Sequence, residues 1–131
     1  MITEDYVSLE TAKLLKEKGF DEVCFKYALN GEIYNNGDFV ISHVDDVEIG
    51  IPTLQTAMKW LRKIHKLGVF PTTYYREINR NIKHDYGSTI VRLDTHEIIG
   101  NDKNIADYTF EAETYEETAE KAIRYCLENL I

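Results

Sequence analysis

The residues best suited to chemistry are histidines that lie near aspartates. Asp94 and His96 are two positions apart, a spacing that places both side chains on one face of a strand. A zinc or other divalent ion would need three or four such ligands to converge. The histidine spacings of 41 and 12 residues match no metal-binding motif, and histidines beside acids are common on acidic surfaces. The sequence therefore predicts no cofactor and keeps a metal-dependent hydrolase as an alternative, with the candidate ligands His43, His84, Asp94 and His96.

Patterns typical of covalent catalysis or phosphate binding are missing from the sequence. It contains no GxSxG motif, and its seven glycines are scattered rather than grouped in a phosphate-binding loop. Cys24 and Cys126 lie 102 positions apart and have no partner at a metal-site or redox spacing. We expect two reduced, buried thiols, although a disulfide between them stays open. The sequence favours a protein without catalytic activity.

Three helices are expected to position the rest of the chain. Ser8 and Thr53 are suitable N-cap residues, and Gly19 and Gly68 stand where the first two helices should end. The third helix starts with a capping-box pattern at residues 114–117 and has an apolar face at helical spacing. The expected helices cover residues 9–18, 54–67 and 115–130.

Strand-like segments fill the regions between the helices. Residues 22–29 alternate in polarity and precede Asn30-Gly31, a strong hairpin signal because both residues tolerate positive φ. Pro71 cannot donate a ladder hydrogen bond, which favours an edge strand or a late strand start. The remaining strands are expected at residues 33–34, 39–44, 69–78, 89–94 and 108–111, with 98–99 as an extension.

These elements follow one another in the order α-β-β-α-β-β-β-α. Hairpins dominate and no βαβ alternation is present, so we expect an α+β fold with an antiparallel sheet and helices packed on one of its faces. A chain of 131 residues is expected to form a single domain, residues 1–131. His65 falls on the apolar side of the second helix, where we expect a hydrogen-bonded core histidine.

The composition excludes several classes of protein. The chain has 15 basic and 23 acidic residues, a formal charge of −8 and a pI near 5.0. Because phosphate groups are bound by cations, a general nucleic-acid-binding protein is not expected. No apolar stretch approaches the roughly 20 residues of a membrane span, and the acidic start lacks a secretory-signal pattern. We therefore expect a cytoplasmic protein that does not contact membranes.

The charge is distributed unevenly along the chain. Residues 49–76 contain five cations and no anions, a net charge of +5. Since the whole chain carries −8, the remaining residues together carry −13. Three interpretations stay open: a solvated face, ion pairs within the chain or with a second copy, and binding of an anionic ligand or nucleic acid. Glu117, Glu120 and Glu128 are the candidate acids within the chain. Four of the cations lie within about 100° of the second helix, namely Lys59, Arg62, Lys63 and Lys66.

A second candidate interaction surface lies in the expected strand after the second helix. This strand contains Tyr74, Tyr75 and Arg76 in succession. Aromatic residues and arginine are enriched at protein interfaces, although tyrosine is also a common strand residue. Both the interface and the plain strand interpretation stay open.

Three parts of the chain resemble one group of proteins. The segments are ITEDYVS and AKLLKEKGFD near the start, PTLQ and AMKWLR in the middle, and TYEE and YCLENLI at the end. Together they resemble a set of short, uncharacterised proteins encoded by gut anaerobic bacteria and by their phages and mobile elements. No activity is established for that set. The resemblance implies an accessory protein of phage or mobile-element type and transfers no catalytic residues.

The sequence therefore predicts a non-catalytic interaction module whose partner is another protein or a second copy of itself. The metal-dependent hydrolase is one alternative. Another is a small-molecule-binding domain with a pocket between sheet and helices. A related hypothesis is that the acidic surface imitates nucleic acid and blocks a protein that binds it.

Overall fold

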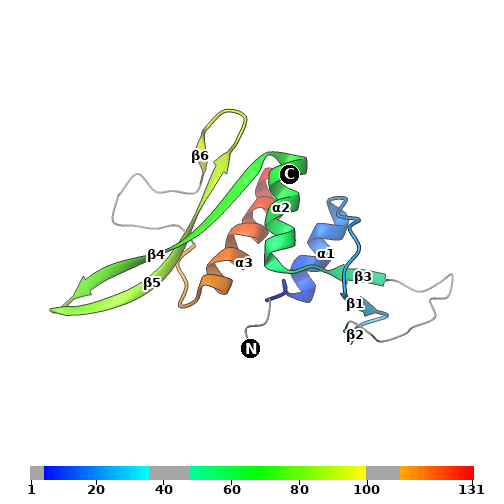
Figure 1. Cartoon of the computed structure of the whole chain (residues 1–131), viewed down its shortest axis with the longest axis horizontal. Coiled ribbons are helices and arrows are strands. Elements are labelled where there is room, and N and C mark those ends of the chain that lie inside the picture. Colours follow the sequence, from blue (N-terminus) through cyan, green and yellow to red (C-terminus); the bar gives the residue numbers. More distant parts are fainter. Residues whose placement is uncertain (1–4, 36–47, 100–109) are drawn as a thin grey trace.

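Three helices and two antiparallel sheets make up the computed structural model, which describes residues 5–35, 48–99 and 110–131 (Figure 1). The helices are α1 (Leu9–Glu17), α2 (Leu54–His65) and α3 (Tyr115–Tyr125), and α3 continues into a π-helical turn, η1 (Cys126–Leu130). The α+β class expected from the sequence is confirmed. No helix within the described ranges has the length and apolar composition needed to cross a bilayer.

The strands form two sheets rather than the single sheet that the sequence predicts. In the first sheet β1 (Lys26–Leu29) lies between β2 (Glu32–Tyr34) and β3 (Glu48–Ile51), and in the second β5 (Asn81–Arg92) lies between β4 (Leu67–Ile78) and β6 (Ile98–Ile99). All pairings are antiparallel. β3 was not predicted, so the observed order is α-β-β-β-α-β-β-β-α. Because α2 begins directly after β3, it separates the first sheet from β4.

Each helix begins where the capping pattern predicts. The hydroxyls of Ser8, Thr53 and Thr114 accept hydrogen bonds of 3.1 to 3.2 Å from the backbone N–H groups three residues later. These N–H groups have no partner inside the helix, so the caps remove the cost of leaving them unpaired. The starts of α1 and α2 also lie side by side, because Val7 donates to the Pro52 carbonyl.

The end of α2 differs from the prediction. The sequence predicts a helix to Leu67 with Gly68 as its terminating residue, whereas α2 ends at His65. Lys66 adopts the left-handed conformation, with φ of 56°, and Leu67 is already the first residue of β4. After α1, Gly19 has the expected left-handed φ of 97°.

The first hairpin is confirmed at its turn, but the strand before it is shorter than predicted. Asn30 and Gly31 have positive φ angles of 51° and 87° and connect β1 to β2. Residues 21–24 have no regular structure, and the side chains of Val23 and Phe25 are 96% and 70% exposed. Their alternation therefore marks an exposed apolar surface rather than one side of a strand. The strand expected at 39–44 lies outside the described residues.

The β4–β5 hairpin is the longest element of the structure. Its two strands have 12 residues each, pair without interruption, and extend beyond the helices (Figure 1). Pro71 lies in β4, at the edge of the sheet, as expected. The strand predicted at 89–94 is thus the end of a longer one. Where a strand was predicted at 108–111, the described residues show a single bridge between Tyr86 and Ala112.

α3 lies at the centre of the core, against β4 and β5 and in contact with α1 and α2 (Figure 1). The buried face is the one that the helical spacing predicts. One continuous hydrophobic cluster includes residues of all three helices and both sheets. The apolar α3 and η1 side chains with no exposed area are Ala119, Ala122, Ile123, Cys126 and Leu127, and Thr118 is equally buried.

Candidate interaction surface on helix α2

The described part of the structure does not bring the predicted metal ligands together. His43 and the side chain of His84 lie outside the described part of the chain. The backbone of His84 is eight residues before Arg92 in β5, about 26 Å away at the usual rise of a strand. Asp94 and His96 lie beyond Arg92, in the turn between β5 and β6. His84 is therefore too far from Asp94 and His96 for the three to bind one ion.

Asp94 and His96 also lack the strand geometry that was expected. Both are exposed, and the N–H of His96 donates to the Arg92 carbonyl at 2.8 Å, which closes a turn. The φ of His96 is 62°, in the left-handed region. Within the described ranges, no group of three or more His, Cys, Asp or Glu side chains is arranged to hold a metal ion.

His65 packs against the core without the hydrogen bond that was expected. Its ring meets Trp60 edge-on, with the centroids 4.7 Å apart, and Trp60 meets Phe20 edge-on at 5.6 Å. The Nε2 atom of His65 is buried and has no hydrogen-bond partner among the described residues. These three rings fix the orientation of Trp60 on the side of α2 that faces α1.

Neither cysteine has the properties of a nucleophile. Both are free thiols; Cys126 is buried, as expected, whereas Cys24 is only half-buried. Burial raises the pKa of Cys126 to about 12. Burial, together with the nearby carboxylate of Glu22, also raises the pKa of Cys24. Since the thiolate is the reactive form, both side chains are protonated and unreactive near neutral pH.

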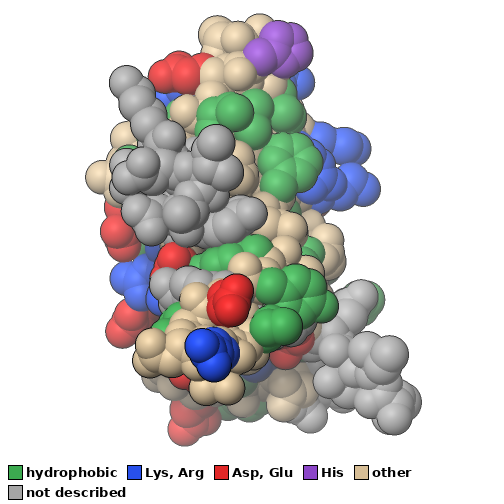
Figure 2. Space-filling view, turned by 90° about the vertical axis from the view of Figure 1, so that its left-hand side faces the viewer, with side chains coloured by type: hydrophobic (Ala, Val, Ile, Leu, Met, Phe, Trp, Pro, Cys, Tyr) green, Lys and Arg blue, Asp and Glu red, His purple; other side chains and the backbone are tan. Residues whose placement is uncertain are grey.

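The tyrosines of the second candidate surface point to opposite faces of the hairpin. Tyr74 is 8% exposed and Tyr75 is 75% exposed, because successive strand residues alternate in direction. Tyr74 is therefore not part of an accessible surface, which corrects the prediction. Ile78 and Ile82 are exposed near the turn, and Figure 2, which looks onto this end of the molecule, shows hydrophobic side chains there. Arg76 belongs to β4, but its side chain lies outside the described part.

The four cations of the basic face lie on the outside of α2 and at its end. Lys59, Arg62, Lys63 and Lys66 are all exposed, while Trp60 and Leu61 between them are buried. Among the described residues, none of the four cationic side chains forms an ion pair or a hydrogen bond. In Figure 2, Lys and Arg side chains gather along the right-hand edge of the molecule.

Of the three acids proposed as partners of these cations, Glu120 and Glu128 have other partners, and the side chain of Glu117 forms no ion pair or hydrogen bond with a described residue. One carboxylate oxygen of Glu120 accepts from the Ser8 N–H at 2.9 Å and from the Thr11 hydroxyl at 2.6 Å. Glu128 pairs with Arg124 at 3.3 Å, and Arg124 also pairs with Glu10 at 3.2 Å. These contacts join α3 to α1 and Arg124 to η1, so neither Glu120 nor Glu128 pairs with the cations of α2.

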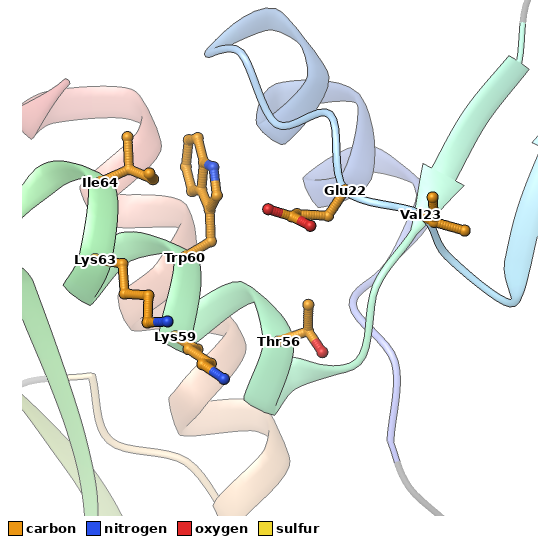
Figure 3. A pocket seen from close by; sticks show the side chains of 7 residues that line it. All are labelled: Glu22, Val23, Thr56, Lys59, Trp60, Lys63 and Ile64. Carbon is orange, nitrogen blue, oxygen red and sulfur yellow. The ribbon is translucent and has the colours of Figure 1, made fainter.

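A cleft of about 310 Å³ lies beside the basic face, between α2 and the irregular segment that precedes β1. In Figure 3 the carboxylate of Glu22 points across the cleft toward Trp60, whose indole nitrogen lies on the cleft side. Lys59 and Lys63, from the same helix, also line the cleft. The other lining residues are Val23, Thr56 and Ile64.

No protein-family model, curated protein or solved structure matches this chain. Function is therefore inferred from the surface that the fold creates. That surface combines a helix face with four cations that pair with no described residue, a cleft that contains the only tryptophan of the chain, and the exposed apolar side chains of Val23, Phe25 and Ile64.

The sequence identified the cations but not the cleft. Glu22 and Trp60 are 38 positions apart and meet only because α1 places the segment after Gly19 against α2. The one local signal was the pair Val23 and Phe25, which lie close to acids yet alternate like strand residues. Without knowledge of the fold, that pattern was assigned to a strand.

Proposed function

We propose that the protein is a non-catalytic interaction module that binds an acidic partner protein through the outer face of α2. The observation that carries this proposal is that Lys59, Arg62, Lys63 and Lys66 have no anionic partner among the described residues. A cluster of four cations repels itself, and an acidic partner would relieve that repulsion.

Cations elsewhere support this interpretation because many of them are engaged. Lys16 and Lys121 donate to the carbonyls of Glu48 and Glu111, at 2.6 and 2.7 Å. Arg124 bridges two carboxylates. The exposed apolar residues Val23, Phe25 and Ile64 add the hydrophobic contact area that interfaces contain beside a charged rim.

We place the protein in the cytoplasm, as an accessory protein of phage or mobile-element type. Two free thiols are typical of a reducing compartment. The segments at the start, middle and end of the chain that resemble such accessory proteins support the genetic context. A second copy of the chain is the alternative occupant of the basic face, and sedimentation distinguishes it from a separate partner protein.

The proposal is tested by affinity capture with two variants of equal charge. Lys59→Glu/Lys63→Glu removes the basic face, and Lys13→Glu/Arg80→Glu changes two exposed cations elsewhere that form no ion pair with a described residue. Wild type and the control variant should retain the same acidic protein from the native host, and the α2 variant should lose it. Retention should also fall between low and high salt, because exposed charges are screened.

Two results would contradict the proposal. One is retention of the same proteins by all three baits, with circular dichroism showing that each is folded. The other is a partner whose binding does not change with salt. Sedimentation of the three purified proteins tests for a homodimer. If wild type and the control variant self-associate and the α2 variant does not, the basic face binds a second copy of the chain.

A further inference from the structure

The cleft beside Trp60 contains a charge of the opposite sign to the basic face. The side chain of Glu22 is exposed and, among the described residues, has no ion-pair partner. Its carboxylate points into the cleft toward α2, and Lys59 and Lys63 line the same cleft from that helix (Figure 3). A segment made only of acids would therefore meet repulsion at the centre of its binding site.

The walls of the cleft fit a cationic side chain. Trp60 and Ile64 provide an apolar surface for the methylene groups of a lysine or arginine, and Glu22 provides a carboxylate for its charged end. The volume of about 310 Å³ is at the lower end for a binding pocket and is sufficient for one long side chain.

We infer that the cleft takes one lysine or arginine side chain from an acidic segment of the partner protein, with carboxylates on either side of it that pair with Lys59 and Lys63. The inference rests on the proposed function and names the sequence pattern of the partner: a cation between anions. It also explains why a lone acid stands beside four cations, since Glu22 selects for the central residue while the lysines attract the flanking ones.

The experiment uses two blocked peptides, Ac-Asp-Asp-Arg-Asp-Asp-NH₂ and the same peptide with glutamine at the centre. Neither peptide contains an aromatic residue, and Trp60 is the only tryptophan in the chain, so its fluorescence reports binding directly. The arginine peptide is the less acidic of the two. Attraction to the lysines alone predicts tighter binding of the glutamine peptide, whereas an ion pair with Glu22 predicts the reverse.

We expect wild type to prefer the arginine peptide by up to about fivefold at low salt, the upper end for an exposed ion pair. Glu22→Gln should reverse that preference. Glu77→Gln, a matched change on the exposed β4–β5 hairpin, should leave it unchanged. Lys59→Glu/Lys63→Glu should weaken both peptides.

Several outcomes would overturn the inference. They are tighter or equal binding of the glutamine peptide by wild type, an unchanged preference in Glu22→Gln, or no fluorescence change with either peptide. A wild-type dimer that the arginine peptide dissociates would make the occupant a second copy and would also overturn it. A different result would show that the proposed function itself is wrong. In that case Lys59→Glu/Lys63→Glu would bind both peptides as wild type does and would keep the captured host protein.

Discussion

Helices α2 and α3 both carry many charges on their outer sides, but the two sets of charges have different environments. On α3, Glu120 accepts hydrogen bonds from Ser8 and Thr11, and Arg124 lies between Glu10 and Glu128. On α2, the four cations contact no acid among the described residues. The charges of α3 hold α1 in place, whereas those of α2 contribute little to the folded structure.

This difference shows that a count of charges does not identify a functional surface. On the acidic α3, Glu120 and Arg124 have partners within the molecule. The basic α2 differs from the rest of an acidic chain, and its four cations have no partner among the described residues. If the comparison is correct, changes on α3 should alter stability, and changes on α2 should alter binding without altering stability.

The largest effect is expected for Glu120→Ala on α3. The substitution leaves the fully buried hydroxyl of Thr11 and the N–H of Ser8 without their carboxylate partner. Hydrogen bonds to charged groups contribute about 1.5 to 3 kcal/mol, so we expect a loss of about 2 kcal/mol in the free energy of unfolding. Urea denaturation measures this, with Glu117→Ala on the same helix as the control. Equal losses in both variants would show that Glu120 has no special role.

The next effect concerns the buried thiol that follows α3. The pKa of Cys126 is raised to about 12 from an ordinary value of 9.0. The unfolded chain therefore releases this proton at lower pH than the folded chain, and folding stability falls as pH rises from 9.0 toward 12. Between about pH 8 and about pH 10, wild type should lose about 1 kcal/mol more than Cys126→Ala. Parallel stability curves for the two proteins would contradict the burial of this thiol.

A smaller effect is expected for the ion pairs of Arg124. Its side chain is 39% exposed, so its pairs with Glu10 and Glu128 are screened by solvent. Arg124→Met keeps the methylene packing and should cost about 0.5 kcal/mol at low salt and less at high salt. Thermal unfolding at the two salt concentrations provides the measurement. A loss that is independent of salt would mean that packing rather than charge is involved.

The smallest change in stability is expected on α2. Lys59→Gln/Lys63→Gln removes two charges that have no partner among the described residues and should alter the free energy of unfolding by less than about 0.5 kcal/mol in either direction. A loss above about 1 kcal/mol would place these lysines with the structural charges of α3 and would remove the contrast between the two helices.

The sequence predicted the elements that depend on local chemistry. The three N-caps, the Asn30–Gly31 turn and the buried face of α3 each need only a few neighbouring residues, and each is confirmed. The division into two sheets was not predicted, because strand pairing depends on contacts between distant segments. β3 was missed since it is a four-residue strand that contains Gly50 and leads directly into a helix.

The candidate site was predictable only in part, for a related reason. Helical periodicity placed the cations of α2 on one face without knowledge of the fold. The same periodicity could not show that Glu120 would bind α1 instead of pairing with α2, nor that Glu22 would face Trp60. Both relations are tertiary contacts between segments more than 30 positions apart.

The most direct test of the account is lysine footprinting of the protein with and without its captured acidic partner. Acylation followed by mass spectrometry reports the accessibility of each lysine separately. We expect Lys59, Lys63 and Lys66 to become protected in the complex while Lys13 and Lys121 keep their reactivity. Protection of Lys13 or Lys121 with no change at Lys59 and Lys63 would contradict the assignment of the interaction surface to α2.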